Sequence, residues 1–420
     1  MAITSSEESA TAHRDRAQHD RALSPEVVRR LLDRMSDLPS LSHLYDKARS
    51  LPDPALGDLP VLTKDDFRTA LPETVLRARQ RAHGSLVLGS GGTTSAPKLS
   101  LVPSGQMIEE IRTVWDPLSA DDVLVNYDTP GRLCSSHAFF NALAHSSGAV
   151  TVPLGAIEDR QLPEWMGMVH RLGATALNAT QSQIAHLLQT CVDAGITPGF
   201  RKLLWTGEPF GAAALEVTRR ILPDAELYGC YGSTETWVIG HNGPGCAMDT
   251  FHLVPYQHVE LDDGLIFVTN LHPECVNPVV RYRIGDRGEF TSCACGRAEP
   301  ALRVLGRDDP QMKFLSILVT PQEIEEAALK DPDVMGVQVA LFDHGAPAER
   351  MELRVKVRDG AQADEVEARV KETVLTQVYR MGYEVETEAP EAFWVRVTPR
   401  FSINERSQKT PLLVKDSPLD

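Results

Sequence analysis

Short apolar runs alternate with amphipathic segments through most of the chain. The runs read SLVLG at 85–89, DVLVNYD at 122–128, AVTVPLG at 149–155, KLLWTG at 202–207 and ELYGCYG at 226–232. Apolar residues recur at helical spacing over 25–35, 137–146, 180–193 and 211–221. Pro25 follows Ser24, a pair that predicts a capped helix start. Apolar strands that alternate with helices are typical of an α/β domain with largely buried sheets.

The pattern changes after residue 306. A helix is predicted over 321–330, strands over 334–342 and 351–357, a helix over 363–378 and a strand over 393–398. Such an α+β unit is large enough to fold alone. The segment LGRDDPQMKF at 305–314 interrupts both patterns. We therefore predict the α/β class, with a large N-terminal domain (21–306) of sheets layered with helices and a small α+β C-terminal domain (307–420).

Composition narrows the function classes. The 420 residues exceed one compact core, and 42% apolar with 24% charged residues is an ordinary globular composition. The net charge of -16 disfavours a nucleic acid or a membrane surface as partner. No apolar stretch approaches the ~20 residues of a membrane span. Residues 1–20 are polar and lack the apolar core of a signal peptide, so we expect a disordered leader and a cytoplasmic location.

The most distinctive local segment is SGGTTSAPK at 90–98, which follows an apolar strand. Its two glycines allow a tight turn and close approach to a ligand. Its hydroxyls and backbone N–H groups can form an anion nest, and Lys98 adds a positive charge. The spacing differs from that of a Walker A loop. Taken alone, the segment fits a phosphate-binding loop and a polar surface turn about equally.

Four further segments follow in order: WTGEPF at 205–210, YGSTET at 231–236, RYRIGD at 281–286 and LGRDD at 305–309. Together with SGGTTSAPK they resemble the core motifs of the adenylate-forming superfamily, which includes acyl- and aryl-CoA ligases, nonribosomal adenylation domains and luciferases. TGEPF, YGSTE and RYRIGD look most like the phenylacetate–CoA ligase branch. The resemblance spans residues 90 to roughly 325.

The resemblance implies ATP-dependent activation of a small aromatic or heteroaromatic carboxylic acid. The acid would become an acyl-AMP with release of pyrophosphate, and a thiol of CoA or of a phosphopantetheine carrier protein would then accept the acyl group. Two alternatives stay open: transfer to a non-thiol acceptor, and a non-catalytic nucleotide-binding relative. The oligomeric state, including a homodimer, is also open.

The resemblance also assigns a nucleotide site. SGGTTSAPK would hold the β- and γ-phosphates, Tyr231 would lie against adenine, and Thr234 would contact the α-phosphate. Glu235 would hold Mg2+, while Asp286 and Arg307 would bind the ribose. The implied ATP-binding residues are Ser90, Gly91, Gly92, Thr93, Thr94, Lys98, Gly207, Glu208, Pro209, Tyr231, Gly232, Ser233, Thr234, Asp286, Arg307 and Lys313.

In this family the C-terminal domain is mobile and rotates between adenylation and thioester-forming states. Asp309 matches the hinge position. Lys409, in RSQKTPLL, matches the catalytic lysine, which would act with Lys98, Thr234 and Glu235 on the charge that develops at the α-phosphate. Lys415 is a competing candidate. The sequence departs from the family pattern at three positions, Ser316, Gln408 and Leu412.

The resemblance places the acid between the helix near 137–143 and the loops at 205–208 and 230–237. The predicted lining residues are His137, Phe140, Asn178, Trp205, Trp237 and Ile239. Flat or apolar side chains among them suit an aromatic ring. Phe140 and Trp205 equally fit the core, and Asn178 equally fits a cap of the helix at 180–193.

A zinc site is a further hypothesis. Cys293 and Cys295 form C-A-C, and Cys246 and His252 lie upstream. Three cysteines and a histidine can make a closed tetrahedral site, which would be structural rather than catalytic. The arrangement resembles that of phenylacetate–CoA ligase relatives with a structural zinc. His258 could replace His252, and ordinary reduced thiols are the alternative.

Overall fold

The computed structural model describes residues 23–89, 99–131, 133–207, 210–308, 312–315, 317–343, 349–378, 381–382, 385–386, 389–404 and 409–416. The predicted leader, residues 1–20, lies outside them. The first described elements are helical: α2 (Pro25–Ser36), α3 (Pro39–Ser42), η1 (His43–Tyr45), α4 (Asp46–Arg49), η2 (Leu56–Asp58), α5 (Lys64–Thr69) and α6 (Leu71–Arg79). Ser24 accepts a hydrogen bond from the Val27 N–H at its side chain, which confirms the predicted start of α2.

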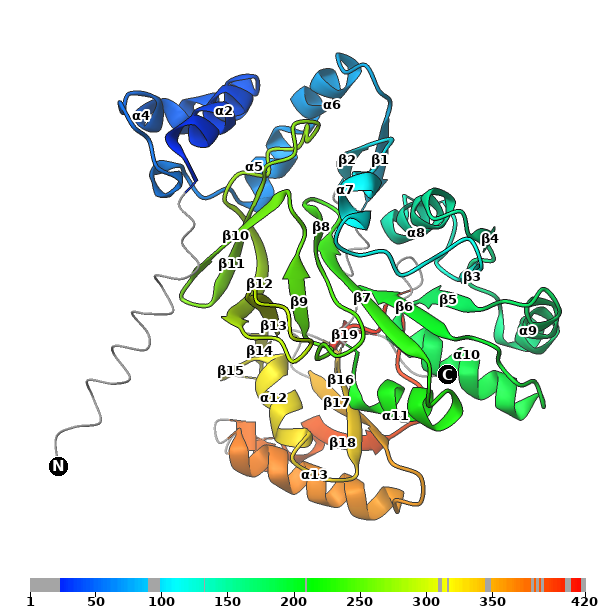
Figure 1. Ribbon diagram of the computed structural model, residues 1–420. Coiled ribbons are helices and arrows are strands. Elements are labelled where there is room, and N and C mark those ends of the chain that lie inside the picture. The colour runs from blue at the N-terminus through cyan, green and yellow to red at the C-terminus, as the bar shows by residue number, and fades with distance from the viewer. Residues whose placement is uncertain are drawn as a thin grey trace, which may run out of the picture.

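An eleven-stranded sheet forms the centre of the large domain, in the order β10-β11-β12-β13-β9-β8-β7-β6-β5-β3-β4 (Figure 1). The parallel half contains β3 (Val123–Asn126), β4 (Val150–Val152), β5 (Ala176–Ala179), β6 (Lys202–Thr206) and β7 (Glu226–Ser233). The antiparallel half contains β8 (Trp237–His241), β9 (Thr250–Leu253), β10 (Gln257–Asp262), β11 (Leu265–Asn270), β12 (Tyr282–Thr291) and β13 (Ala301–Arg307).

Helices cover both faces of the parallel half. The helices are α7 (Ile108–Arg112), α8 (Ser135–Ser146), η3 (Asp159–Gln161), α9 (Leu162–Arg171), α10 (Gln181–Asp193) and α11 (Ala212–Ile221). Leu203 belongs to a core cluster with α9, α10 and α11, whereas its neighbour Leu204 belongs to a cluster with α7 and α8. This alternation is the period of two of a strand. Ligands of such sheets bind outside the carboxyl ends of the parallel strands.

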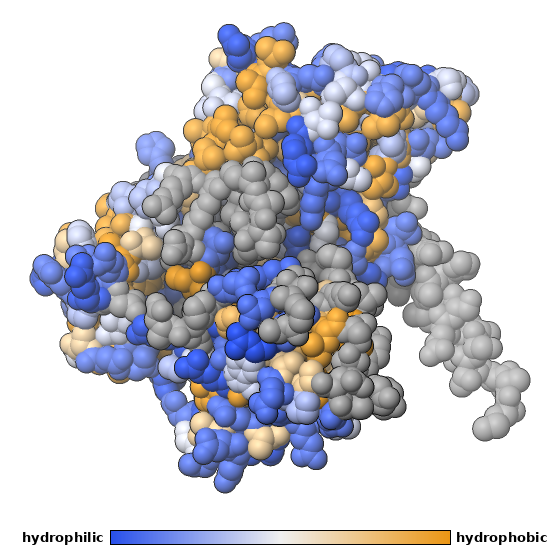
Figure 2. Space-filling model, turned by 180° about the vertical axis from the view of Figure 1, so that it is seen from behind, coloured by the Kyte–Doolittle hydropathy of each residue, from blue (hydrophilic) through white to orange (hydrophobic). Residues whose placement is uncertain are grey.

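The strand predicted at 85–89 forms, but outside the central sheet. β1 (Ser85–Gly89) pairs with β2 (Leu99–Pro103) in a two-stranded sheet, which is its only sheet among the described strands. Val87 keeps 44% of its surface exposed, so the expectation of a buried strand was wrong here. A hairpin outside a large sheet has no layer of helices on both faces. Figure 2 shows apolar surface over α6 and β1, to which Val75, Leu76, Leu86 and Val87 contribute.

The C-terminal part is a smaller α+β unit. It contains β14 (Met312–Phe314), β15 (Ile317–Val319), α12 (Pro321–Ala328), β16 (Val334–Phe342), β17 (Arg350–Val357), α13 (Ala363–Gln377), η4 (Pro390–Ala392), β18 (Phe393–Val397) and β19 (Leu413–Lys415). Its sheet has the order β18-β17-β16-β19, and α12 and α13 pack on one face in a separate core (Figure 1). The predicted class, a large sheet-rich domain and a smaller α+β domain, is therefore confirmed. The boundary residue stays a prediction.

None of the helices in the described part of the chain has the length and apolar character that crossing a bilayer requires.

Candidate active site

A tight hairpin at the end of β7 carries the YGSTE motif. Thr234, Glu235 and Thr236 connect β7 to β8, and Thr236 donates its N–H to the Ser233 hydroxyl over 3.2 Å. A Cβ on Gly232 would lie 2.3 Å from the carbonyl oxygen of Trp237, so only glycine fits there. Thr234 lies 3.3 Å, oxygen to oxygen, from Ser135, the first residue of α8. The hairpin tip therefore meets the start of α8.

Tyr231, Asp286 and Arg307 form one connected group. The Tyr231 hydroxyl donates to Asp286 over 2.7 Å, and Arg307 pairs with the other carboxylate oxygen over 2.9 Å. Asp286 and Arg307 are cross-strand partners on β12 and β13. Burial raises the pKa of Asp286, while Arg307 opposes this shift. The carboxylate is thus fixed in orientation from two sides.

Asn277 brings Glu235 next to the ends of the SGGTTSAPK segment. Gly89 and Leu99, the residues that flank this segment, face each other in the β1–β2 pair. The Asn277 amide donates to the Ser100 hydroxyl over 2.9 Å and to the Glu235 carbonyl over 3.3 Å. The Glu235 side chain accepts from the Tyr282 hydroxyl at 3.4 Å and is nearly buried. The backbone of Glu235, whose carboxylate is the predicted ligand of a hard cation, therefore lies beside the flanks of the predicted phosphate loop.

Lys409, from the C-terminal part of the chain, lies against Gly207 at the end of β6. A Cβ on Gly207 would lie 2.6 Å from Lys409 Cε and 3.0 Å from its Nζ. Gly207 also has a φ of 85°, which favours glycine. The positive charge of Lys409 is within electrostatic reach of Asp286 and Asp128, and it lowers the pKa of both against the larger, raising effect of burial. Lys415 instead lies on β19, opposite Leu341.

Sequence reasoning missed Asp128. This carboxylate follows β3 at its carboxyl end, is 4% exposed and accepts from the Asn178 amide over 2.7 Å. Burial raises its pKa, and hydrogen bonds from Asn178 and Ser136 oppose the shift. The signal in the sequence was an aspartate directly after a buried parallel strand, the place where ligands of such sheets bind.

The predicted acid-pocket residues separate into two groups. His137 and Asn178 lie next to Asp128: His137 Nδ1 is 2.7 Å from the Asp128 carbonyl oxygen, and Asn178 lies at the end of β5. Asn178 is not the cap of α10, because Thr180 takes that position with Gln183 in a capping box. The unpaired Oδ1 of Asn178 is buried.

The aromatic candidates are core residues. Phe140 and Trp237 pack with α7 and α8, where both contact Phe139 edge-on. Trp205 lies in the cluster of the opposite sheet face, against Phe210 and Phe251. Their exposed fractions are 0%, 5% and 2% for Phe140, Trp237 and Trp205. Ile239 is also buried, in the cluster next to the N-terminal helices.

Several predicted residues lie outside the described part of the chain. They are Ser90, Gly91, Gly92, Thr93, Thr94, Lys98, Glu208, Pro209, Asp309, Ser316 and Gln408. Lys313 belongs to β14, but its side chain is not among those described. The roles of all these residues stay predictions.

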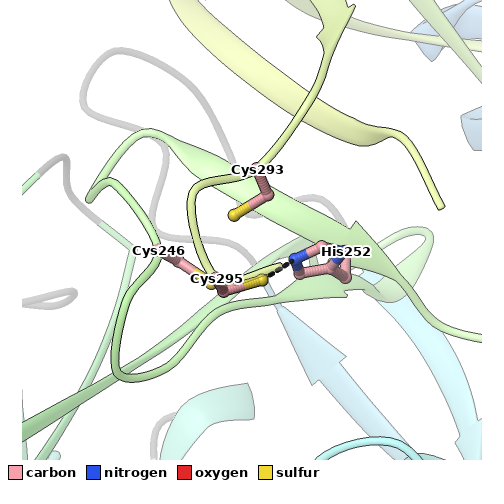
Figure 3. A group of neighbouring side chains, drawn as sticks. All are labelled: Cys246, His252, Cys293 and Cys295. Carbon is pink, nitrogen blue, oxygen red and sulfur yellow. Dashed lines mark hydrogen bonds between the residues drawn. The ribbon is translucent and has the colours of Figure 1, made fainter. Parts of the chain in front are cut away.

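The cysteine–histidine set comes together (Figure 3). The ligand atoms of Cys246, His252, Cys293 and Cys295 all lie within 4.8 Å of one another, and His252 Nε2 is 3.2 Å from the Cys295 sulfur. Burial, with the neighbouring Cys293 thiol, raises the pKa of Cys246 to about 12. His258, on β10, is not part of this set. The donors are those of a closed tetrahedral site for Zn2+.

Comparisons with known proteins agree with this geometry. Residues 63–259 match the family model of AMP-binding enzymes. The L-proline–L-prolyl-carrier-protein ligase of Streptomyces coelicolor is 26% identical over 364 residues, which cover 78% of this chain and 66% of that protein. The chain thus spans just under two thirds of that relative. The indoleacetate–lysine synthetase of Pseudomonas savastanoi is 21% identical over 328 residues, 76% of this chain and 80% of that protein.

Solved structures share the fold. A 2-hydroxyisobutyryl-CoA ligase in the postadenylation state matches with a TM-score of 0.63 at 19% identity, over 96% of this chain and 90% of that chain. An amide bond synthetase from Marinactinospora thermotolerans matches with a TM-score of 0.52 at 15% identity, over 78% and 67% of the two chains. These matches support the adenylate-forming superfamily, which the five ordered motifs indicated.

Proposed function

We propose that this protein activates a carboxylic acid as an acyl-AMP at the expense of ATP. The observation that carries the proposal is the approach of Lys409 to Gly207, within electrostatic reach of Asp286. A lysine from the C-terminal part of the chain thus comes within electrostatic reach of the predicted ribose-binding carboxylate of the large domain. Adenylation of a carboxylic acid needs a cation such as the lysine ammonium, because negative charge accumulates at the α-phosphate.

In this reaction the substrate carboxylate attacks the α-phosphorus, the bond to the β-phosphate oxygen breaks, and pyrophosphate leaves. Tyr231 and Arg307 fix the orientation of Asp286, whose carboxylate would accept hydrogen bonds from the ribose hydroxyls. Thr234, at the hairpin tip, would contact the α-phosphate, and Lys409 would neutralise charge there. Glu235 would hold Mg2+, which would balance the charge of the triphosphate.

The acid would lie at the carboxyl ends of β3 and β5, near Asp128, Asn178 and His137. Activation of an aromatic acid stays part of the proposal, and its support is the indoleacetate in the name of one relative. The buried aromatic residues do not add to that support. The second step, transfer to a thiol of CoA or of a carrier protein, rests on the carrier protein in the name of the other relative.

Structural zinc at Cys246, His252, Cys293 and Cys295 is part of the same proposal. Four protein ligands would leave no open position, so the ion would join the segment after β8 to the loop before β13. The cytoplasmic location expected in the sequence analysis is proposed as well.

The test is exchange of labelled pyrophosphate into ATP with benzoic, phenylacetic and indole-3-acetic acids and L-proline. At least one acid should raise exchange about tenfold or more above the rate without acid. Measurable ATP binding without acid-dependent exchange across the panel would favour a nucleotide-binding relative without turnover. Once an acid is found, the adenylate is offered to CoA, to a carrier protein with a free phosphopantetheine thiol, or to an amine. Consumption by one of them identifies the acceptor class.

A further inference from the structure

Residues 398–404 and 409–412, the described residues between β18 and β19, include Lys409 and lie on the face of the C-terminal sheet opposite α12 and α13. Alternate residues of β16 and β17, such as Val337 and Leu353, belong to the core under the helices. Gln338 and Arg354, which lie between these core positions, are cross-strand partners and point the other way. Both are fully buried, although they are polar. A buried polar pair on a sheet face needs partners, and Ser402 and Pro411 supply them.

Gln338 bonds this segment on both sides of Lys409. Its amide nitrogen donates to the carbonyl of Ser402 over 2.8 Å and to the carbonyl of Pro411 over 3.0 Å. Its amide oxygen accepts from the Ser402 N–H over 2.9 Å and from Arg354 over 3.1 Å. A side-chain amide offers two donors and about two acceptor positions, so Gln338 uses its full capacity. An apolar residue would leave three backbone groups of the segment without this partner.

Arg354 fixes the orientation of Gln338. The same guanidinium donates to the Ser402 hydroxyl over 2.7 Å and, through Nε, to Glu352 over 2.7 Å. Trp394 donates to the other oxygen of Glu352 over 3.2 Å. Buried ionic networks of this kind often stabilise a fold no more than apolar residues of the same volume would. We therefore infer that this network serves to fix the geometry of the residues bonded to it, Ser402 and Pro411.

Backbone bonds complete the connection to Lys409. The Asn404 N–H donates to the Lys409 carbonyl over 2.8 Å, and the Val339 N–H donates to the Leu412 carbonyl over 2.7 Å. The backbone of Lys409 is thus bonded directly and again three residues further on, while its ammonium extends to Gly207.

We propose that Gln338, oriented by Arg354, is a positioning residue for adenylation: it fixes residues 402–404 and 409–411 so that the Lys409 ammonium reaches the α-phosphate. This inference rests on the proposed function, because it takes the role of Lys409 from there. A displacement of about 1 Å at a reacting group can reduce a rate about a hundredfold. Loss of Gln338 should therefore act on turnover and leave ATP binding largely intact.

The kinetic test uses Gln338→Leu, with Gln377→Leu as a control on the exposed side of α13. Pyrophosphate exchange is measured with whichever panel acid gives the fastest rate. Gln338→Leu should lower kcat for exchange about 10- to 100-fold with the KM for ATP within about 2-fold, and Gln377→Leu should match the wild type. In a Lys409→Ala background, Gln338→Leu should cause no further loss, since the group it positions is gone.

The outcomes are distinguishable. Full exchange by Lys409→Ala would contradict the proposed role of that lysine. Loss with Lys409→Ala but wild-type exchange with Gln338→Leu would overturn only the positioning inference. An equal loss from Gln338→Leu in both backgrounds would also overturn it, because the effect would then be a general one.

A second measurement needs no substrate. Hydrogen exchange of the 399–412 peptide should become faster in Gln338→Leu, with the 363–377 peptide of α13 as an internal reference. Ser402→Ala, which removes the hydroxyl contact with Arg354 and keeps the backbone bonds to Gln338, should give a smaller change in the same direction. Unchanged protection of 399–412 in both variants would rule out the inference.

Discussion

Lys409 and Gly207 meet across the two domains, and neither residue can be replaced without consequence. A side chain at Gly207 would displace the end of the Lys409 side chain. A short apolar residue in place of Lys409 would remove the positive charge from the site. We expect Lys409→Ala to lower acid-dependent pyrophosphate exchange about 100-fold or more while ATP binding changes by less than about 3-fold. Lys415→Ala, on β19, is the matched control and should behave as the wild type. A larger loss in Lys415→Ala would reverse the assignment.

Asp128 makes a prediction about pH. Its pKa is raised in the folded protein, mainly by burial, so the folded state binds this proton more tightly than the unfolded chain does. The stabilising contribution of the protonated form is therefore present at low pH and is lost as the pH rises through the folded-state pKa. Asp128→Asn should make the stability of the folded protein fall less steeply with rising pH. The measurement is the difference in melting temperature between variant and wild type across about pH 4.5 to 8. A constant difference across that range would mean that Asp128 does not titrate there.

At the level of elements, periodicity predicted α2, α8 and α10 to α13, together with the parallel strands β3, β4, β6 and β7. It did not predict α3 to α7, α9 or β5. α10 and β16 form within a residue of the expected ranges, because their apolar residues repeat at the helical or strand period over many positions. The antiparallel strands β10 to β13 were not predicted. QHVELD of β10 and YRIGDRGEFT of β12 mix polar and apolar residues, since one face of these strands is partly exposed.

The candidate site divides in the same way. The grouping of Tyr231, Asp286 and Arg307 was predictable, because an ordered set of motifs fixed their roles together. Trp205 was assigned to the pocket, yet it faces the other side of the sheet from Phe140. One residue of register decides which face a strand side chain takes, and composition alone carries no information about that register.

Two loops are joined at the cysteine–histidine set, which makes zinc an element-level prediction. Purified protein should contain about one equivalent of zinc per chain. Cys293→Ser should lose most of it and melt at least about 5 °C lower, because a structural ion contributes directly to folding. Cys134→Ser, whose thiol lies near Ser136 at the start of α8, is the control and should keep its zinc. If the purified wild type contains no zinc and a chelator leaves its melting temperature unchanged, the zinc prediction is wrong and the four side chains are ordinary thiol and imidazole groups.

On the scale of the whole molecule, helix α11 of the large domain contacts the turn after β17 of the small domain. Two exposed ion pairs connect them: Arg358 with Glu216 at 3.4 Å, and Arg220 with Asp359 at 2.8 Å. Each exposed pair contributes about 0.5 kcal/mol, and salt screens it. These pairs belong to the arrangement in which Lys409 lies against Gly207. A domain that rotates, as the superfamily resemblance implies, would have to break them.

Charge reversal should therefore shift the balance between domain arrangements. Glu216→Arg with Arg220→Glu replaces two attractions by two repulsions, for about 1 to 2 kcal/mol. That is enough to reduce pyrophosphate exchange about 5- to 30-fold at about 0.05 M salt. The loss should shrink at about 1 M salt. Adding Arg358→Glu and Asp359→Arg restores opposite charges and should restore exchange, although no residue of the nucleotide site has changed. If the fourfold variant stays as slow as the double variant, α11 acts through its fold and the ion pairs do not favour the adenylating arrangement.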